Sequence, residues 1–261
     1  MKKQEHSRIY SILILSIALL SWGIVVSKKN ALYLVGDSTV ASGRGWGKYL
    51  PTFIDTTKID IRNYAVAGTS SRTFITNGVY DKNLMKNGMW DTVYANLQKG
   101  DYVIIQFGHN DPFSLNDTAH ARGSIKGIGE ETSDIFNLLT HKQETVHTYG
   151  WYLRKFVTDT KEKGAVPVIC SLIPRNKWKD GKIVRDSNYA KWAKDVAVQT
   201  DVTFIDLNNI VADLYDAEGE AAVKAKYFDP ADPIHPNRAG STLNASIVAK
   251  ALKELKIGAS N

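Results

Sequence analysis

The sequence predicts an α/β protein in which helices cover both faces of a parallel β-sheet. Short runs that are apolar throughout recur along the chain and alternate with amphipathic stretches. A strand is apolar on both sides when both are buried, which is the usual case in parallel sheets with helical crossovers. Five such runs mark the expected strands, at residues 32–35, 59–66, 102–107, 166–173 and 202–205.

Three further stretches have the apolar spacing of helices. They cover residues 145–163, 188–200 and 243–255. The last one carries an apolar stripe that includes Leu243, Ile247 and Val248. No internal repeat or linker divides the chain, so we expect one domain at residues 29–261.

Residues 1–28 are expected to form a leader. Lys2 and Lys3 precede a mainly apolar stretch at residues 9–26, which is the pattern of an export signal. The stretch is also near the roughly 17 residues needed to span a bilayer, and no Ala-x-Ala cleavage site is obvious. A cleaved signal peptide, which we favour, and an uncleaved membrane anchor are both open. Both place the domain outside the cytoplasm, as a secreted, periplasmic or membrane-anchored protein.

The net charge of +6 comes mostly from this leader. Up to residue 29, five basic side chains stand against one acidic side chain, Glu5, which leaves only +2 for the remaining chain. A surplus so small does not indicate nucleic-acid binding.

Cys170 is the only cysteine of the chain. One thiol cannot form an internal disulfide, although exported proteins are free to form them. Cys170 lies in a buried-strand pattern, so we interpret it as a small core residue rather than as a reactive thiol.

Residues 111–144 differ from the rest of the domain. They are polar, rich in Gly and Ser, and show little periodicity. A stretch this long without regular structure is usually functional, and this one follows the end of a strand, where open parallel sheets bind ligands. We therefore expect a substrate-facing loop that could include a short helix.

Three polar or flexible residues follow predicted strands. Ser38 comes directly after the first strand, Gly68 follows the second, and Asn110 follows the third. At the carboxyl edge of a parallel sheet the serine hydroxyl would be exposed. The glycine leaves its N–H free to point into a site, and the asparagine amide could donate to an oxyanion.

The fourth feature is Asp232-Pro-Ile-His235, near the end of the chain. Prolines at 233 and 236 hold the segment extended, and Asn237 is expected to cap the last helix. A histidine fixed in this way and oriented by an aspartate can take the proton of a serine hydroxyl. Ser38, His235 and Asp232 are therefore candidates for a nucleophile, a base and an orienting acid.

The order of these motifs resembles the four sequence blocks of the SGNH (GDSL) hydrolase family. The blocks are Gly-Asp-Ser-Thr at 36–39, Gly68, Gly-His-Asn-Asp at 108–111 and Asp-Pro-Ile-His at 232–235. The resemblance is strongest to the rhamnogalacturonan acetylesterase branch. It rests on residues 33–41, 45–50, 63–74 and 100–111.

The resemblance implies a flavodoxin-like three-layer α/β/α sandwich with a five-stranded parallel sheet. It also implies a triad of Ser38, Asp232 and His235, with an oxyanion hole made by the Ser38 N–H, the Gly68 N–H and the Asn110 side chain. No metal or other cofactor is implied. Ile234 stands where family members often have threonine, and residues 111–144 have no match that can be aligned.

We therefore expect an exported serine esterase that removes O-acetyl groups from a plant cell-wall polysaccharide, with pectic rhamnogalacturonan as the favoured substrate. The alternatives are an esterase of the same fold acting on a lipid ester, a thioester or a bacterial envelope glycan, and a non-catalytic glycan-binding protein. The oligomeric state is open.

Several side chains near these motifs are candidates for holding sugar. Arg72 attracts attention because pectic substrates carry carboxylates, which arginine binds in bidentate fashion. The other candidates are Trp46, His109, Phe113 and Phe136.

Overall fold

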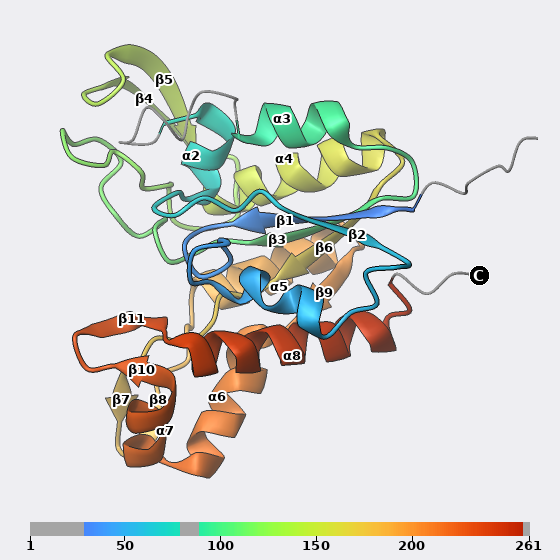
Figure 1. The fold of residues 1–261 in the computed structure, drawn as a ribbon. Coiled ribbons are helices and arrows are strands. Elements are labelled where there is room, and N and C mark those ends of the chain that lie inside the picture. Colours follow the sequence, from blue (N-terminus) through green and yellow to red (C-terminus); the bar gives the residue numbers. More distant parts are fainter. Residues whose placement is uncertain (1–28, 79–88, 258–261) are drawn as a thin grey trace, which may run out of the picture.

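The computed structural model describes residues 29–78 and 89–257 and has a five-stranded parallel sheet at its centre (Figure 1). The strands lie in the order β2-β1-β3-β6-β9. They are β1 (Ala31–Gly36), β2 (Asp60–Asn63), β3 (Tyr102–Gln106), β6 (Val166–Cys170) and β9 (Thr203–Ile205). This is the flavodoxin-like strand order. All five predicted strands are present, so the predicted fold class is confirmed.

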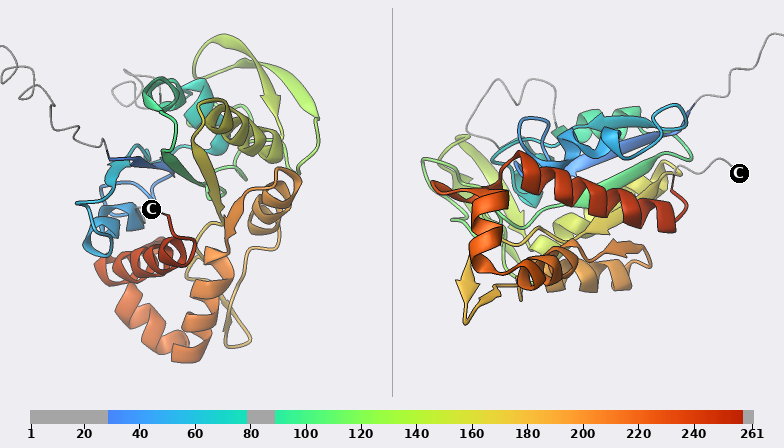
Figure 2. Two further views of the ribbon diagram at one scale, coloured as in Figure 1. Left: turned by 90° about the vertical axis from the view of Figure 1, so that its right-hand side faces the viewer. Right: turned by 60° about the horizontal axis from the view of Figure 1, so that its bottom comes forward.

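Helices cover both faces of this sheet, as Figures 1 and 2 show. One face carries α2 (Ser71–Thr76), α3 (Met89–Asn96), α4 (Tyr149–Glu162) and α5 (Tyr189–Gln199). The other carries α6 (Leu207–Glu218), α7 (Glu220–Tyr227) and α8 (Arg238–Glu254), with the short 3₁₀ turns η1 (Trp46–Lys48) and η2 (Leu50–Thr52).

The alternation of side chains explains why the central strand β1 is apolar throughout. Along β1, Tyr33 and Val35 belong to the core under α2 to α5, whereas Leu32 and Leu34 belong to the core under α6 to α8. Successive side chains of a strand point to opposite faces, so both must be apolar when both faces are covered. Cys170 is buried in the second core, where burial raises the pKa of its thiol.

The three predicted helices are present with shifted bounds. α5 is within one residue of the prediction at each end, and α8 begins five residues earlier than predicted. Asn237 caps α8 as expected, because its Oδ1 accepts from the Gly240 N–H at 3.1 Å. The prediction for α4 was wrong at its start: residues 142–147 form a strand, and Thr148 caps the helix by accepting from the Trp151 N–H.

Residues 111–144 contain no helix, contrary to the option left open above. They include β4 (Thr132–Asn137), which pairs with β5 (Lys142–His147) as an antiparallel hairpin. Two smaller hairpins are β7 (Trp178–Lys179) with β8 (Lys182–Ile183), and β10 (Phe228–Asp229) with β11 (Asp232–Pro236). All three lie at the end of the molecule to which the sheet strands point, on the left in Figure 1.

The predicted leader at residues 1–28 lies outside the described residues. Within residues 29–78 and 89–257, no helix has both the length and the apolar character needed to cross a membrane.

Candidate active site

A buried aspartate shapes the turn that presents Ser38 after β1. The Asp37 carboxylate accepts from the Thr39 N–H at 2.9 Å and from the Thr39 hydroxyl at 2.8 Å. The backbone carbonyl of Asp37 also accepts from the N–H groups of Val40 and Ala41. Aspartate commonly bonds its own backbone two residues on. That preference is the sequence signal from which this role of Asp37 could have been found.

The structure brings Ser38 together with the segment 197 residues further along the chain. Ser38 Oγ lies 2.8 Å from His235 Nε2, and His235 Nδ1 lies 2.8 Å from Asp232 Oδ2. If Nδ1 carries the proton toward the carboxylate, Nε2 is free to accept the serine proton. This is the hydrogen-bond chain that a nucleophilic serine needs.

Local backbone bonds fix Asp232 for this arrangement. Its Oδ1 accepts from the N–H groups of Ile234 at 3.1 Å and His235 at 3.0 Å. Burial alone would raise the pKa of Asp232, but hydrogen bonds from the His235 backbone, the His235 ring and the Ile234 N–H outweigh it and lower the pKa. Arg44 adds a mostly exposed ion pair to Oδ2 at 2.8 Å. Asp232 therefore stays ionised at neutral pH.

Gly68 and Asn110 line the same pocket as Ser38 and His235. Gly68 has a φ of +81°, a conformation that favours glycine. Within the described chain, neither the Ser38 N–H nor the Gly68 N–H donates to a protein acceptor. The Asn110 amide donates one proton to the Thr69 carbonyl at 2.8 Å, which leaves its second proton for a ligand. Three donors are thus available beside the serine.

His109, a candidate for holding sugar, also lines this pocket. It is almost fully buried, and neither ring nitrogen has a partner among the described residues. Burial lowers the pKa of His109, because a charged ring would lose its hydration there. The ring is therefore neutral, with one donor nitrogen and one acceptor nitrogen.

The prediction that Trp46 binds substrate was wrong. Its side chain is fully buried in the core beneath α8, and its Nε1–H donates to Gln106 Oε1 at 2.9 Å. An indole that is large and apolar, with one donor, gains most from such a core position.

The prediction that Arg72 binds a substrate carboxylate was also wrong. Its side chain has no exposed surface and forms a two-point ion pair with Glu144, with distances of 2.6 and 2.8 Å. The third guanidinium nitrogen, Nη1, donates to the carbonyls of Leu115 and Gly123. All three guanidinium nitrogens of Arg72 donate to groups inside the protein. Arg72 therefore holds residues 111–144 in place and does not contact a ligand.

The pocket has a volume of about 680 Å³ and a basic rim. Phe113 is 46% exposed there, and the Arg122 guanidinium lies 4.2 Å from its ring centroid while donating to the Gly68 carbonyl. Phe136, by contrast, is exposed on β4 and does not line this pocket. Arg44, Arg122 and Arg175 also line the pocket, and no sequence motif indicated them because they lie in loops.

Among the described residues, no group of three or more His, Cys, Asp or Glu side chains could hold a metal ion.

Comparisons with known proteins show the family to which the chain belongs. Residues 34–243 match the model of the GDSL-like lipase/acylhydrolase family. A rhamnogalacturonan acetylesterase from Emericella nidulans is 33% identical over 241 residues, which cover 91% of each chain. A probable rhamnogalacturonan acetylesterase from Bacillus subtilis is 27% identical over 237 residues, 87% of this chain and 94% of that one.

The crystal structure of another Bacillus subtilis protein shares the fold. It superposes with a TM-score of 0.67 at 22% identity, over 88% of this chain and 58% of that one. The family match over residues 34–243 and the 33% identity to the fungal enzyme show that the chain belongs to the GDSL-like lipase/acylhydrolase family.

Proposed function

We propose that this protein is a serine esterase that removes O-acetyl groups from a plant cell-wall polysaccharide, with pectic rhamnogalacturonan as the favoured substrate. The observation that carries the chemistry is the chain of hydrogen bonds from Ser38 through His235 to Asp232. The names of the two relatives support the substrate class.

In the proposed reaction Ser38 Oγ attacks the acetyl carbonyl while His235 Nε2 takes the hydroxyl proton. The negative charge that develops on the carbonyl oxygen is stabilised by the Ser38 N–H, the Gly68 N–H and the Asn110 amide. His235 then gives its proton to the departing sugar oxygen, which leaves an acetyl-serine. A water molecule, deprotonated by the same histidine, attacks this ester and releases acetate.

The surroundings of Ser38 favour a polymer over a lipid. The catalytic pocket shares Gly43 and Arg44 with a cavity of about 1000 Å³ on one side. It shares Phe113 and Arg175 with a cavity of about 510 Å³ on another. A chain of sugars could therefore extend from Ser38 in both directions. The arginines would bind the polar groups of a sugar better than they would bind an apolar acyl chain.

A substrate panel tests this function. The purified enzyme should release acetate from acetylated rhamnogalacturonan and from an aryl acetate, with little turnover of aryl esters of long fatty acids. The Ser38→Ala variant should be inactive on all of them. A preference for long acyl chains would replace this proposal by a lipid esterase, and no turnover on any ester would indicate a binding protein.

Such a substrate lies outside cells, so we also propose that residues 1–28 direct export and that residues 29–261 form the catalytic domain. The first strand begins at Ala31, so removal of residues 1–28 should leave a folded, active enzyme. Activity and solubility of the truncated protein check this. Loss of folding on truncation would mean that the leader belongs to the domain.

A further inference from the structure

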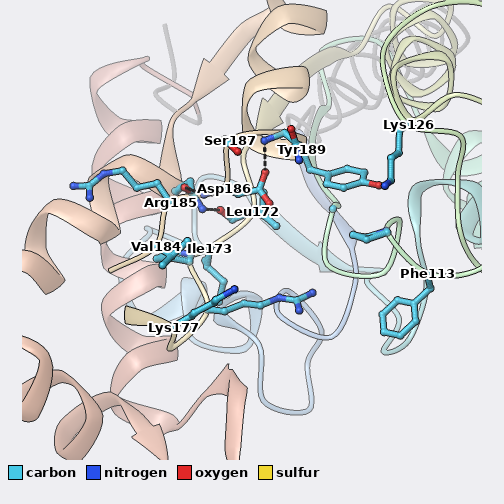
Figure 3. Close-up of a pocket in the computed structure, with 16 residues that line it drawn as sticks. Phe113, Lys126, Leu172, Ile173, Lys177, Val184, Arg185, Asp186, Ser187 and Tyr189 are labelled. Carbon is cyan, nitrogen blue, oxygen red and sulfur yellow. Dashed lines mark hydrogen bonds between the residues drawn. The ribbon is translucent and has the colours of Figure 1, made fainter. Parts of the chain in front are cut away.

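A second cavity adjoins the catalytic pocket (Figure 3). It has a volume of about 510 Å³ and lies where β3 and β6 end and α5 begins, lined in part by Gly108, Leu172 and Tyr189. Phe113 and Arg175 line both this cavity and the pocket that contains Ser38. A ligand that spans both would place one part at the serine and another beside α5.

This cavity has unpaired positive charge. Lys126 and Lys177 line it, and within the described chain neither ammonium group has an ion-pair or hydrogen-bond partner. Arg175 uses one nitrogen to donate to the His109 carbonyl at 2.9 Å and keeps its other donors. We call the space lined by Lys126, Arg175, Lys177 and Tyr189 the cationic cavity.

The other charged residues of the lining do not cancel this surplus. Arg185 is paired with Asp213 and Asp216 on α6, and it points away from Tyr189 and Phe113 in Figure 3. Asp186 accepts from two backbone N–H groups at the start of α5. Apart from Arg185, the lining therefore has one carboxylate, Asp186, and three cations, Lys126, Arg175 and Lys177. The two lysines among these cations have no partner within the described chain.

Tyr189 supplies an independent sign of a ligand. The residue is only 4% exposed, and its hydroxyl has no hydrogen-bond partner among the described residues. Tyr189 is one of the residues that line the cavity. A buried hydroxyl without a hydrogen-bond partner destabilises the fold. A ligand acceptor that reached the Tyr189 hydroxyl from the cavity would satisfy it.

We propose that the cationic cavity binds the carboxylate of an acidic sugar unit in the same polysaccharide chain whose acetyl ester lies at Ser38. This inference rests on the proposed function and identifies where a carboxylate of its substrate binds. Lys126, Lys177 and Arg175 supply the charge, and the Tyr189 hydroxyl donates to the carboxylate. The carboxylate recognition that the sequence suggested for Arg72 is thereby placed on other residues, outside the core.

The test measures binding of a deacetylated galacturonate oligomer, both by inhibition of aryl acetate hydrolysis and by calorimetry. Replacing both lysines, in Lys126→Gln/Lys177→Gln, should weaken binding by about three- to tenfold, since each exposed ion pair contributes modestly. Higher salt should weaken binding to the wild type. The kcat and KM for the small neutral aryl acetate should not change, because neither lysine lines the catalytic pocket.

A matched control removes two charges elsewhere. Lys250 and Lys253 are exposed on α8 and line none of the three cavities described. The Lys250→Gln/Lys253→Gln variant should bind the oligomer as the wild type does, and a neutral xylose oligomer should bind equally to all three proteins. Equal affinity of the wild type and the Lys126→Gln/Lys177→Gln variant for the galacturonate oligomer would overturn the inference.

Tyr189→Phe tests the cavity without a change of charge. It should weaken galacturonate binding by about three- to tenfold through the loss of one hydrogen bond. The melting temperature should not fall, because the hydroxyl has no protein partner. Unchanged affinity in this variant would remove Tyr189 from the site.

The two proposals can fail separately. Binding of the oligomer through the two lysines, without acetate release from acetylated rhamnogalacturonan, would refute the proposed function and support the cavity. Acetate release together with oligomer binding that does not depend on the two lysines would support the proposed function and refute the role of the cationic cavity.

Discussion

Two segments meet above the carboxyl edge of the sheet, and they are held there in different ways. Residues 228–237 carry Asp232 and His235 in a short hairpin that is fixed by local bonds between backbone N–H groups and one carboxylate. Residues 111–147 form a long polar region that is fixed by buried charges. Arg72 bonds the carbonyls of Leu115 and Gly123 and the carboxylate of Glu144 in β5.

Asp111 adds a second buried anchor to the long segment. Its carboxylate accepts from the N–H and hydroxyl of Ser71 at the start of α2, and from the Ser124 hydroxyl at 3.0 Å. The long segment is thus tied to α2 at two points, by Arg72 and by Asp111. Buried polar groups of this kind destabilise the fold strongly when one partner is lost.

Because the two segments are held differently, we expect mutations in one to change the catalytic rate and mutations in the other to change the stability of the fold. The triad side chains are partly exposed, so their replacement should affect catalysis and leave the fold intact. The anchors of the long segment touch no reacting atom, so their replacement should affect stability first. The following experiments test this separation, from the largest expected effect to the smallest.

Ser38→Ala should lower kcat by about 10⁴-fold or more, because a triad acts as a unit. Its melting temperature should stay near that of the wild type. Aryl acetate turnover and thermal unfolding check the two halves of the expectation, with Ser246→Ala on α8 as a control that should keep full activity. A Ser38→Ala enzyme that retained a tenth of the activity would remove Ser38 from the mechanism.

Arg72→Met should lower the free energy of unfolding by about 3–5 kcal/mol, because it leaves the largely buried Glu144 carboxylate unpaired. Denaturant unfolding measures this. The kcat of the folded variant on an aryl acetate should remain close to the wild-type value. Lys224→Met, which breaks an exposed ion pair with Glu220 on α7, is the matched control and should barely change stability.

A stable Arg72→Met protein with a raised KM for the acidic polymer would contradict this assignment. It would return Arg72 to the substrate site.

Asn110→Ala should lower kcat by about 10²- to 10³-fold, with a smaller change in KM, because the amide serves a charge that exists only in the transition state. Steady-state kinetics on one aryl acetate, corrected by active-site titration, measure the effect. A rise in KM at unchanged kcat would make Asn110 a substrate contact instead.

The pH dependence of stability should report Asp111. Burial raises the pKa of Asp111 to about 6, against the opposing hydrogen bonds from Ser71 and Ser124. A carboxyl whose pKa is raised in the folded state stabilises the fold at low pH and loses this contribution as the pH rises through the folded pKa. The free-energy difference between wild type and Asp111→Asn should therefore shift by about 2 kcal/mol against the wild type from pH 4.5 to 7.5.

Denaturant unfolding of both proteins across this pH range checks the shift. A difference that is constant with pH would mean that Asp111 titrates normally in the folded protein.

The sequence by itself determined the features that depend on neighbouring residues or on burial patterns. The apolar runs indicated the strands because burial on both faces favours apolar residues along a strand, although the half-buried β2 carries Asp60, Arg62 and Asn63. The Asn237 cap of α8 was predictable because capping involves only residues close in the chain. The motifs around Ser38, Asn110 and His235 were recognisable because they follow strand ends or adjoin prolines.

The tertiary structure alone decided which charges are buried and which are free. Arg72 and Arg175 both lie in polar surroundings of the sequence, yet one is paired in the interior and the other lines two cavities. Their partners, Glu144 and the His109 carbonyl, are more than 60 residues away. The start of α4 was missed for a similar reason, because residues 142–147 pair with β4 and become a strand. Long-range pairing of this kind leaves no periodic trace in the local sequence, so only the folded chain reveals it.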